Sequence, residues 1–484
     1  MKTKRALSML LLTAVFAAGC EDTSSQQNPT HYVTESDDAI QAVTEPEEVK
    51  VIDDLPADLD FKGRELRILT TENTYSSPLL VEESTGDVLD DAKYERNAKV
   101  MERFGITMTE ELEMWIDATE KARNTILSGD DAYDLISLID REALTFASEG
   151  MLWSADEVEN IDLSKPYWNQ YLNSCLTLGK KQILAYSDIC MTTYDFTHVL
   201  LFNQQLVEDL KLISPYDLVE DGSWTIDKFG EYALAATDDL NGDTQMDKSD
   251  RYGFAAYPKQ VSPCFWIASG CVSIEKNDDD LPEFTMANER MLSVIQKAYD
   301  ISWGGSAWYI QASSDYTANT ELFTNGQALF ADAALSTPFG AEYRNMKDDY
   351  GIIPYPKYDE TQTSYYSRVE GGCPYFIPVT IEDTCFAGAM MESLACESYN
   401  SVIPVYYEIA LKAKYVRDSQ SAKVLDLIME NRVYDWGDTF FTNYIRDGFV
   451  WYKFAEGKLV AASDIESNRT AVEGAIKNIV DKLS

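Results

Sequence analysis

A short β-strand is predicted by the stretch Glu65-Leu66-Arg67-Ile68-Leu69-Thr70, and this stretch opens the pattern that decides the fold. A helix is expected at 90–104, where apolar residues recur at helical spacing. An alternating strand at 106–112, a second helix at 117–127 and an apolar strand at 133–139 follow in turn. This strand–helix–strand–helix–strand order predicts an α/β fold with a mainly parallel sheet that helices cover on both faces.

The length and composition of the chain predict two folded lobes. At 484 residues the chain is too long for one ordinary hydrophobic core, and its 45% apolar content excludes a wholly disordered protein. The formal net charge is −42 at pH 7, and a surface of this kind repels nucleic acid and anionic lipid headgroups. We therefore expect no nucleic-acid partner, and we interpret the charge as an aid to solubility outside a cell.

The first residues have the pattern of an export signal. A basic start at 2–5 precedes an apolar run at 6–18, which is shorter than the roughly 20 residues that span a bilayer. The run ends in small residues and Cys20, an ending that resembles a bacterial lipobox, in which the cysteine is lipidated. We expect a signal peptide at 1–19 and a protein anchored to the cell membrane through Cys20, facing outside the cell. The alternative is an ordinary secreted protein with a coincidental cysteine.

A flexible tether is expected between this anchor and the folded body. Positions 21–60 hold twelve acidic residues against the single base Lys50, with few large apolar side chains between them. Such a composition cannot bury a core. We assign residues 20–62 to the lipidated cysteine and its acidic tether.

The cysteines beyond Cys20 do not have the spacing of a disulfide framework. They are odd in number and contain no C-x-x-C pair: Cys175, Cys190, Cys264, Cys271, Cys373, Cys385 and Cys396. Most are expected to be small buried side chains. A bond between Cys264 and Cys271 across a short loop is the alternative for that pair.

A calcium-binding loop is predicted between Asp239 and Asp250. Its oxygen ligands would be the side chains at loop positions 1, 3, 5, 9 and 12 and a backbone carbonyl at position 7: Asp239, Asn241, Asp243, Asp247, Asp250 and Gln245. Thr244 replaces the usual glycine and Asp250 replaces the usual glutamate, so the loop resembles those of dockerins more than an EF-hand. Calcium would have a structural role in the second lobe. The alternative is a solvated acidic turn.

Catalytic chemistry finds little support in the sequence. The chain has only two histidines, His31 and His198, which nearly excludes histidine-dependent triads and His-rich zinc sites. The segment 304–308 lacks the last glycine of a nucleophile elbow, and no phosphate-binding loop is present. We expect no enzyme, and we interpret His198 as a core residue with satisfied hydrogen bonds.

A binding cleft is favoured instead. Aromatic residues make up 12% of the chain, with 29 tyrosines and 9 tryptophans, and flat rings suit the apolar faces of sugars while polar side chains pair with hydroxyls. Ligands of parallel α/β sheets lie beyond the carboxyl ends of the strands. The candidate ligand-binding residues are Tyr75, Asp140, Arg141, Asp195, Trp266, Trp303, Trp308, Tyr309 and Glu370.

From about Glu65 to Lys482 the chain resembles the family 1 extracellular solute-binding proteins, the lipoprotein receptors of bacterial sugar-type ABC importers. The resemblance rests on short motifs in a shared order: the lipobox, Leu201-Phe202-Asn203, Trp224-Thr225-Ile226-Asp227, the loop from Asp239 into Tyr252-Gly253, Asn325-Gly326-Gln327-Ala328, and Gly351 to Pro356. It implies a two-lobed periplasmic-binding-protein-like fold with several hinge crossings. By that likeness the N-terminal lobe would hold 63–190 plus 366–400, and the C-terminal lobe 191–365 plus 401–484.

The resemblance implies a monomeric receptor that closes its lobes round a carbohydrate, expected to be an oligosaccharide, and delivers it to the permease subunits of an ABC transporter. Closure would be a population shift driven by contacts that only the closed form makes. Two other functions remain open at this stage. One is an enzyme that degrades polysaccharide, and the other is a surface protein that captures glycans without a transporter.

Overall fold

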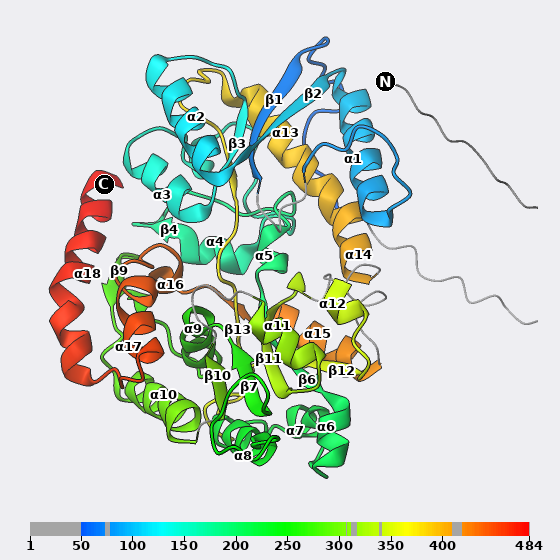
Figure 1. Cartoon of the computed structure of the whole chain (residues 1–484). Helices are drawn as coiled ribbons and strands as arrows, with labels where there is room; N and C mark the ends of the chain where they lie inside the picture. Colours follow the sequence, from blue (N-terminus) through cyan, green and yellow to red (C-terminus); the bar gives the residue numbers. More distant parts are fainter. Residues whose placement is uncertain are drawn as a thin grey trace, which may run out of the picture. The chain divides into compact units, whose positions relative to one another are not determined.

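Two main β-sheets organise the residues that the structure describes (Figure 1). The structure is a computed structural model and describes residues 50–72, 78–305, 307–310, 317–337, 341–408 and 419–483. Cys20 and Tyr75, the predicted lipidation residue and one predicted ligand contact, lie outside these ranges. None of the described helices combines the length and the apolar character that crossing a membrane requires.

The first sheet confirms the strand–helix pattern that opens the folded body. Its strand order is β14–β3–β1–β2, and the four strands are β1 (Glu65–Glu72), β2 (Thr107–Met114), β3 (Leu135–Ser137) and β14 (Tyr375–Phe376). β1 pairs in parallel with β2 and β3, whereas β14 pairs antiparallel with β3. The connecting helices are α1 (Val88–Phe104), α2 (Trp115–Ser128) and α3 (Asp140–Ser148).

The two faces of β1 bury different helices because side chains alternate along a strand. Ile68 packs in one hydrophobic cluster with Phe104 of α1 and Phe386 of α13 (Thr384–Glu397). The neighbouring Leu69 belongs to the other cluster, with Ala118 of α2. Figure 1 shows α13 beside α1 on one side of this sheet and α2 on the other.

The second sheet has five strands in the order β10–β7–β11–β6–β12: β7 (Tyr252–Ala256), β10 (Trp308–Ile310), β11 (Ala328–Ala334), β6 (His198–Asn203) and β12 (Tyr350–Ile353). β7 pairs in parallel with β10 and β11, while β6 pairs antiparallel with β11 and β12. The α/β class is therefore confirmed, with sheets that are mixed rather than wholly parallel. The exact lobe boundaries remain predictions.

The other elements surround these sheets. The remaining helices are α4 (Gln170–Leu176), α5 (Thr192–Asp195), α6 (Gln204–Asp209), α7 (Pro215–Glu220), α8 (Ile226–Ala236), α9 (Pro258–Ala268), α10 (Glu289–Tyr299), α11 (Ala318–Thr324), α12 (Ala341–Arg344), α14 (Ile403–Val405), α15 (Ser419–Glu430), α16 (Trp436–Thr439), α17 (Trp451–Ala455) and α18 (Ala462–Leu483). Short helical turns are η1 (Ala155–Glu157), η2 (Asp300–Gly304), η4 (Ser398–Val402) and η6 (Arg446–Val450). Three two-stranded pairs complete the fold: β4 (Thr177–Leu178) with β5 (Lys181–Gln182), β8 (Ile274–Lys276) with β9 (Pro282–Phe284), and β13 (Ser367–Arg368) with β15 (Arg432–Val433).

The start of the folded body differs from the expected tether. Asp53 forms an ion pair of 2.6 Å with Arg103, and the Val51 amide donates to Asn400 Oδ1 at 3.0 Å. The Phe61 ring meets that of Phe386 at 4.9 Å between centroids. The prediction that the tether extends to residue 62 is therefore wrong for the described residues 50–62, because their few apolar side chains pack on the first lobe.

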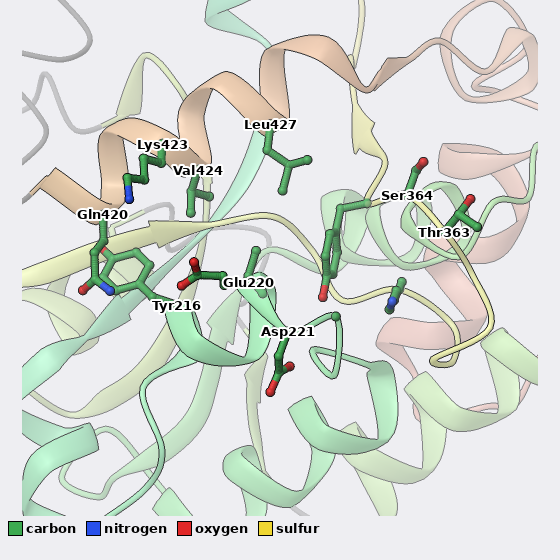
Figure 2. Close-up of a pocket in the computed structure, with 13 residues that line it drawn as sticks. Tyr216, Glu220, Asp221, Thr363, Ser364, Gln420, Lys423, Val424 and Leu427 are labelled. Carbon is green, nitrogen blue, oxygen red and sulfur yellow. The ribbon is translucent and has the colours of Figure 1, made fainter.

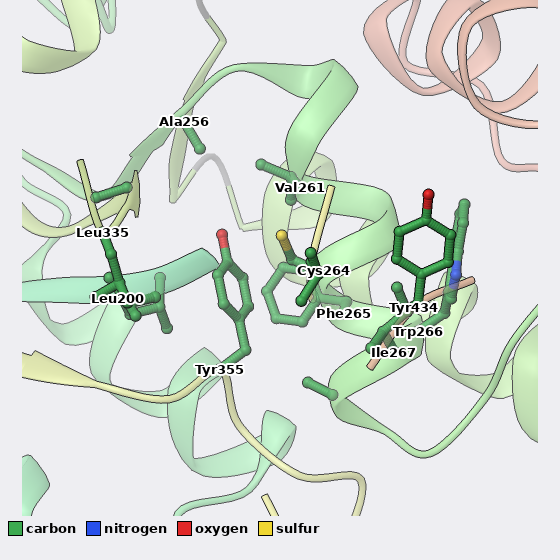
Figure 3. Packing of buried hydrophobic residues seen from close by; sticks show 14 of the residues in the cluster. Leu200, Ala256, Val261, Cys264, Phe265, Trp266, Ile267, Leu335, Tyr355 and Tyr434 are labelled. Carbon is green, nitrogen blue, oxygen red and sulfur yellow. The ribbon is translucent and has the colours of Figure 1, made fainter. Parts of the chain in front are cut away.

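All seven cysteines of the described ranges are free thiols, including Cys264 and Cys271. Figure 3 shows Cys264 beside Tyr355 and Phe265, within the apolar packing that α9 contributes to the core. Cys264 is 1% exposed and Cys271 is 6% exposed, which fits their interpretation as small buried side chains.

Candidate functional site

A polar cavity of about 300 Å³ lies where the carboxyl end of β3 meets the segment between β13 and β14. We call it the Asp140–Glu370 pocket, and its lining residues are Ile139, Asp140, Arg141, Phe196, Gln260, Glu370, Gly371, Gly372, Cys373, Thr439, Thr442 and Arg446. The pocket therefore gathers residues from α3, α9, α16 and η6 round one crossing segment. It brings together three of the predicted ligand-binding residues, Asp140, Arg141 and Glu370.

Asp140 is held in one orientation by four donors. Its Oδ2 accepts from the Tyr434 hydroxyl at 2.6 Å, the Gly372 amide at 2.9 Å and the Tyr186 hydroxyl at 3.0 Å. Its Oδ1 accepts from the amide of Arg141 at 2.8 Å. Burial raises the pKa of Asp140 to about 6, although these hydrogen bonds act to lower it. The carboxylate is therefore a fixed acceptor whose charge is sensitive to mildly acidic pH.

Gly371 explains how the crossing segment approaches this carboxylate. A Cβ atom at residue 371 would lie 2.6 Å from Asp140 Oδ2, which is closer than side chains approach one another. Only a residue without Cβ lets the backbone amide of Gly372 reach Asp140. The Glu370-Gly371-Gly372 sequence is thus a close-packing feature of the pocket.

Glu370 forms the opposite side of the pocket and is tied to two elements. Its Oε1 accepts from Arg446 at 3.0 Å, and both carboxylate oxygens lie 3.1 Å from the side-chain amide nitrogen of Gln260. Its Oε2 lies 3.3 Å from His198 Nε2. Burial alone would raise the pKa of Glu370, but Arg368, His198 and Arg446 together hold it well below the usual range. Glu370 is therefore ionised at neutral pH.

A buried cluster of His198, Cys264 and Asp332 lies beneath Glu370, and their ligand atoms fall within 4.8 Å of one another. It is the one group of this kind among the residues that the structure describes. The guanidinium of Arg368 lies 3.0 Å from His198 Nε2 and 3.9 Å from Cys264 Sγ. A fixed cation at this distance opposes a metal ion, so we assign the cluster to the charge network of the pocket. His198 is a core residue with polar partners, as the sequence predicted.

The four predicted aromatic contacts that lie in the described residues are not brought to this pocket. Trp266 is fully buried and its indole N–H donates to Asp435 at 2.9 Å, while that of Trp308 donates to the Ala256 carbonyl at 3.2 Å. Trp303 donates to the Phe454 carbonyl at 2.9 Å, and Tyr309 packs on another tyrosine. Each indole thus has a partner in the folded body; the rings of Trp266 and Trp308 are buried in the core, and Trp303 is half-buried.

The glycine pair 304–305 was the reason for expecting those rings in an exposed loop. Gly304 instead ends the helical turn η2, and a Cβ at Gly305 would lie 2.3 Å from a methyl group of Leu234. Gly305 therefore packs against α8, while Gly304 is exposed. Close packing, rather than loop flexibility, accounts for the second glycine of the pair.

Asp195 lies outside the pocket, in a small neighbouring cavity of about 30 Å³. It is buried and accepts from the Tyr406 hydroxyl at 2.6 Å. Burial raises its pKa to about 7. The pocket residues that sequence reasoning missed are Ile139, Phe196, Gln260, Gly371, Gly372, Cys373, Thr439, Thr442 and Arg446. Ile139 and residues 371–373 adjoin predicted residues in the sequence, whereas the others have no local motif, so only tertiary contacts reveal them.

The predicted calcium loop folds its oxygen side chains onto its own backbone. The pairs are Asp239 with the amides of Gly242 and Thr244, Asn241 with Asp243, Asp243 with Gln245, Asp247 with Ser249, and Asp250 with Leu240 and Asp247, all at 2.7–3.0 Å. Thr244 takes the left-handed conformation, with φ of 68°, that glycine usually supplies at this position. Among the described residues, no three carboxylates of this loop converge within 4.8 Å. Its donor set suits calcium, and calcium binding stays a prediction.

The two mixed sheets and their helices define a fold class, the two-lobed periplasmic-binding-protein-like fold, and solved structures share it. A cyclo/maltodextrin-binding protein complexed with maltotetraose has a TM-score of 0.58 at 13% identity, covering 87% of this chain and 98% of that one. The ABC substrate-binding protein Lmo0181 of Listeria monocytogenes, in complex with cycloalternan, gives 0.55 at 12% identity, with 86% and 99% covered. The maltose/maltodextrin-binding domain MalE of Bdellovibrio bacteriovorus, bound to maltotriose, gives 0.53 at 16% identity, with 85% and 100% covered.

No family profile matches the sequence, and no curated protein sequence matches it. Identities of 12–16% establish the fold and leave the ligand to be argued from the residues of this chain. The predicted resemblance to solute-binding proteins is confirmed at the level of the fold.

Proposed function

We propose that this protein is a carbohydrate-binding receptor of the solute-binding class and that it performs no catalysis. The observation that carries the proposal is the Asp140–Glu370 pocket, because it places fixed acceptors and donors in a fold shared with sugar-binding receptors over most of the chain. Sugar hydroxyls both donate and accept. They therefore suit a pocket that offers carboxylates, guanidinium groups, an amide and threonine hydroxyls together.

The receptor would deliver its ligand to the permease subunits of an ABC importer. Support for this role comes from the similar solved structures, one of which is described as an ABC substrate-binding protein. The pocket is lined by residues of α3, which follows β3 of the first sheet, and by residues of α9, α16 and η6. A ligand that contacts both groups would favour the conformation in which they lie close together. We propose an oligosaccharide as the cargo and a monomer as the working form.

We also propose that Cys20 carries a lipid anchor and holds the receptor on the outer side of the cell membrane. The basic start, the short apolar run and the lipobox-like ending support this placement. The acidic residues that follow Cys20 would form a tether up to the packed segment that begins near Val51.

Calcium would have a structural role in this receptor, bound by the loop from Asp239 to Asp250. The hydrogen bonds within the loop preset its turns, and its carboxylate and amide oxygens are the ligands that calcium prefers. The ion would offset the repulsion between four aspartates of one short segment.

Isothermal titration calorimetry on the mature protein tests the proposed ligand class. The panel would contain maltotetraose, cellotetraose, xylotetraose, a tripeptide and free amino acids, and we expect binding of at least one neutral saccharide. Tight peptide or amino-acid binding with no response to sugars would contradict the proposal. A reducing-end assay on the same mixtures should show no new sugar ends, since turnover would identify an enzyme.

A further inference from the structure

A second and larger cavity, of about 440 Å³, lies on the C-terminal part of the chain and shares no residue with the Asp140–Glu370 pocket. We call it the Lys357 pocket. Figure 2 shows that α15 covers one side of it with Gln420, Lys423, Val424 and Leu427, while Tyr216 and Glu220 come from α7. Thr363 and Ser364 close a third side.

The floor of this cavity is apolar and rigid. Val219, Val424 and Leu427 line it beside the rings of Tyr216 and Tyr365. Both hydroxyls are already engaged, because Tyr365 donates to the Leu218 carbonyl at 3.3 Å and Tyr216 pairs with Ser421 at 2.5 Å. The rings are therefore held in place in the wall of the cavity, and each tyrosine is 5% exposed.

Lys357 places a buried cation in the wall. Its side chain is 4% exposed, its Nζ donates to the Gln362 carbonyl at 3.0 Å, and it lies 5.3 Å from the Tyr365 ring centroid. None of the ion pairs between described residues includes Lys357. An ammonium has three donors, so donor capacity remains for a ligand.

The rim of the Lys357 pocket carries both acidic and basic side chains. The side chains of Glu220, Gln420 and Lys423 form neither a hydrogen bond nor an ion pair with any described residue. Asp221 adds a second carboxylate, so the charges of Lys357 and Lys423 are matched by those of Glu220 and Asp221. An anionic ligand would meet the carboxylates and a cationic ligand would meet the lysines. A neutral ligand rich in hydroxyls can use both kinds, because each hydroxyl donates and accepts.

We infer that the Lys357 pocket is a second carbohydrate site, which binds a short neutral saccharide at the outer side of α7 and α15. The ring faces would pack on Tyr216 and Tyr365, and the hydroxyls would pair with Lys357, Lys423 and Glu220. The volume lies within the range of small-molecule sites, about 300–1,000 Å³. A receptor with two such sites could hold one part of a glycan chain while the other site selects the ligand. The inference does not depend on the function of the Asp140–Glu370 pocket.

Hydrogen exchange measured by mass spectrometry on the mature chain tests this site directly. The probes are maltotetraose, cellotetraose, xylotetraose and laminaritetraose at millimolar concentration, with trigalacturonate and glutamate as charged comparisons. We expect at least one neutral tetrasaccharide to slow exchange in 216–222, 363–365 and 420–427. The slowing should persist in Glu370→Gln, which alters the other pocket only.

The variant that should lose this protection combines Glu220→Ala with Lys423→Ala, two exposed rim residues whose loss leaves the core intact. We expect its apparent affinity to fall by on the order of tenfold, as for the loss of two hydrogen bonds. Lys477→Ala on α18 is the matched surface control and should keep the protection. Unchanged exchange with every neutral probe, protection by the charged probes alone, or full protection in the double variant would each overturn the inference.

Discussion

Arg368 and Asp438 form a two-pronged ion pair in which neither side chain is exposed to solvent. Arg368 Nε donates to Asp438 Oδ2 at 2.5 Å, and its NH2 group donates to Oδ1 at 3.1 Å. Arg446 joins the pair at 3.2 Å from Oδ1 and continues to Glu370. The pair therefore positions Arg446, which in turn holds the Glu370 carboxylate of the Asp140–Glu370 pocket. Its two parallel hydrogen bonds have the planar geometry that arginine makes with carboxylates.

Replacing Asp438 with Asn should destabilise the protein strongly. The change leaves two buried guanidinium groups with too little negative charge, and breaking such a pair costs about 3–5 kcal/mol. Urea unfolding followed by tryptophan fluorescence measures the free energy of unfolding. Asp481→Asn, which removes an exposed ion pair with Lys477 on α18, is the control and should change little. Equal stability of Asp438→Asn and the parent would show that the network contributes no net stability.

Gly371→Ala should weaken ligand binding more than any other glycine change near the pocket. The new methyl group would lie 2.6 Å from Asp140 Oδ2, and four hydrogen bonds prevent that carboxylate from moving aside. We expect a stability loss of about 1–3 kcal/mol, and an affinity loss on the order of tenfold in calorimetry with the sugar identified for the parent. Gly304→Ala is the control, because its Cβ meets nothing within 4 Å. If Gly371→Ala binds the sugar as tightly as the parent does, Asp140 does not contact the ligand.

Buried aspartates should make the protein more stable as the pH falls from neutral. Burial raises the pKa of Asp188 to about 7 and that of Asp435 to about 6, against about 4 in an unfolded chain. A carboxyl group with a raised folded-state pKa favours folding when it is protonated. The stability that it gives is complete below about pH 4 and is lost as the pH rises to about 7.

Asp188→Asn isolates this effect from the repulsion among the other acidic groups, which the variant and the parent share. The neutral amide can still accept from the Tyr194 hydroxyl, which donates to Asp188 at 2.9 Å. We expect the variant to be more stable than the parent at pH 8, by up to about 4 kcal/mol, and similar to it at pH 4. Thermal unfolding across this range measures the slope. If the variant and the parent have the same stability at every pH, ionisation of Asp188 does not destabilise the folded state.

The fold could be predicted because its signals are local. The apolar stretch at 65–70 and the helix that ends at Gly105 depend on neighbours in sequence, and the structure places both within a few residues of the expected bounds. The antiparallel direction of β6 in the second sheet could not be predicted, since it depends on pairing with β11 and β12, which lie far along the chain. The packed segment at 50–62 was missed for a similar reason, because Asp53 finds its partner Arg103 only in the folded state.

The site was predictable only where a strand end marked it. Asp140 follows β3 directly and lies in the pocket, as the rule for parallel sheets predicts. The tryptophans could not be placed from the sequence, because the number of aromatic rings in a chain does not indicate which rings are exposed. Trp266 is buried in the core, and its indole N–H donates to Asp435. Arg446 and Gln260 lie 76 and 110 residues from Glu370 along the chain, so no local pattern connects them.

Asp243→Ala should remove the response of the protein to calcium while leaving sugar affinity nearly unchanged. Asp243 accepts the Gln245 amide at 2.8 Å, is exposed, and lies in a loop between α8 and β7 that contributes no residue to the Asp140–Glu370 pocket. If calcium binds the loop, the melting temperature of the parent should rise with calcium concentration by mass action. The variant should show no such rise, because one of the carboxylate ligands is gone.

Ser249→Ala is the control for this loop, since its side chain is not among the predicted ligands and its backbone amide still donates to Asp247. Differential scanning calorimetry with calcium or with a chelator gives the comparison, and magnesium tests whether the effect requires the larger ion. Asp250 is fully buried and supports the loop through two amides, so its replacement would confound metal loss with unfolding. The exposed Asp243 avoids this difficulty. If calcium does not change the melting temperature of the parent, the segment is an acidic turn that binds no calcium. The backbone amides alone would then offset the charge of its aspartates.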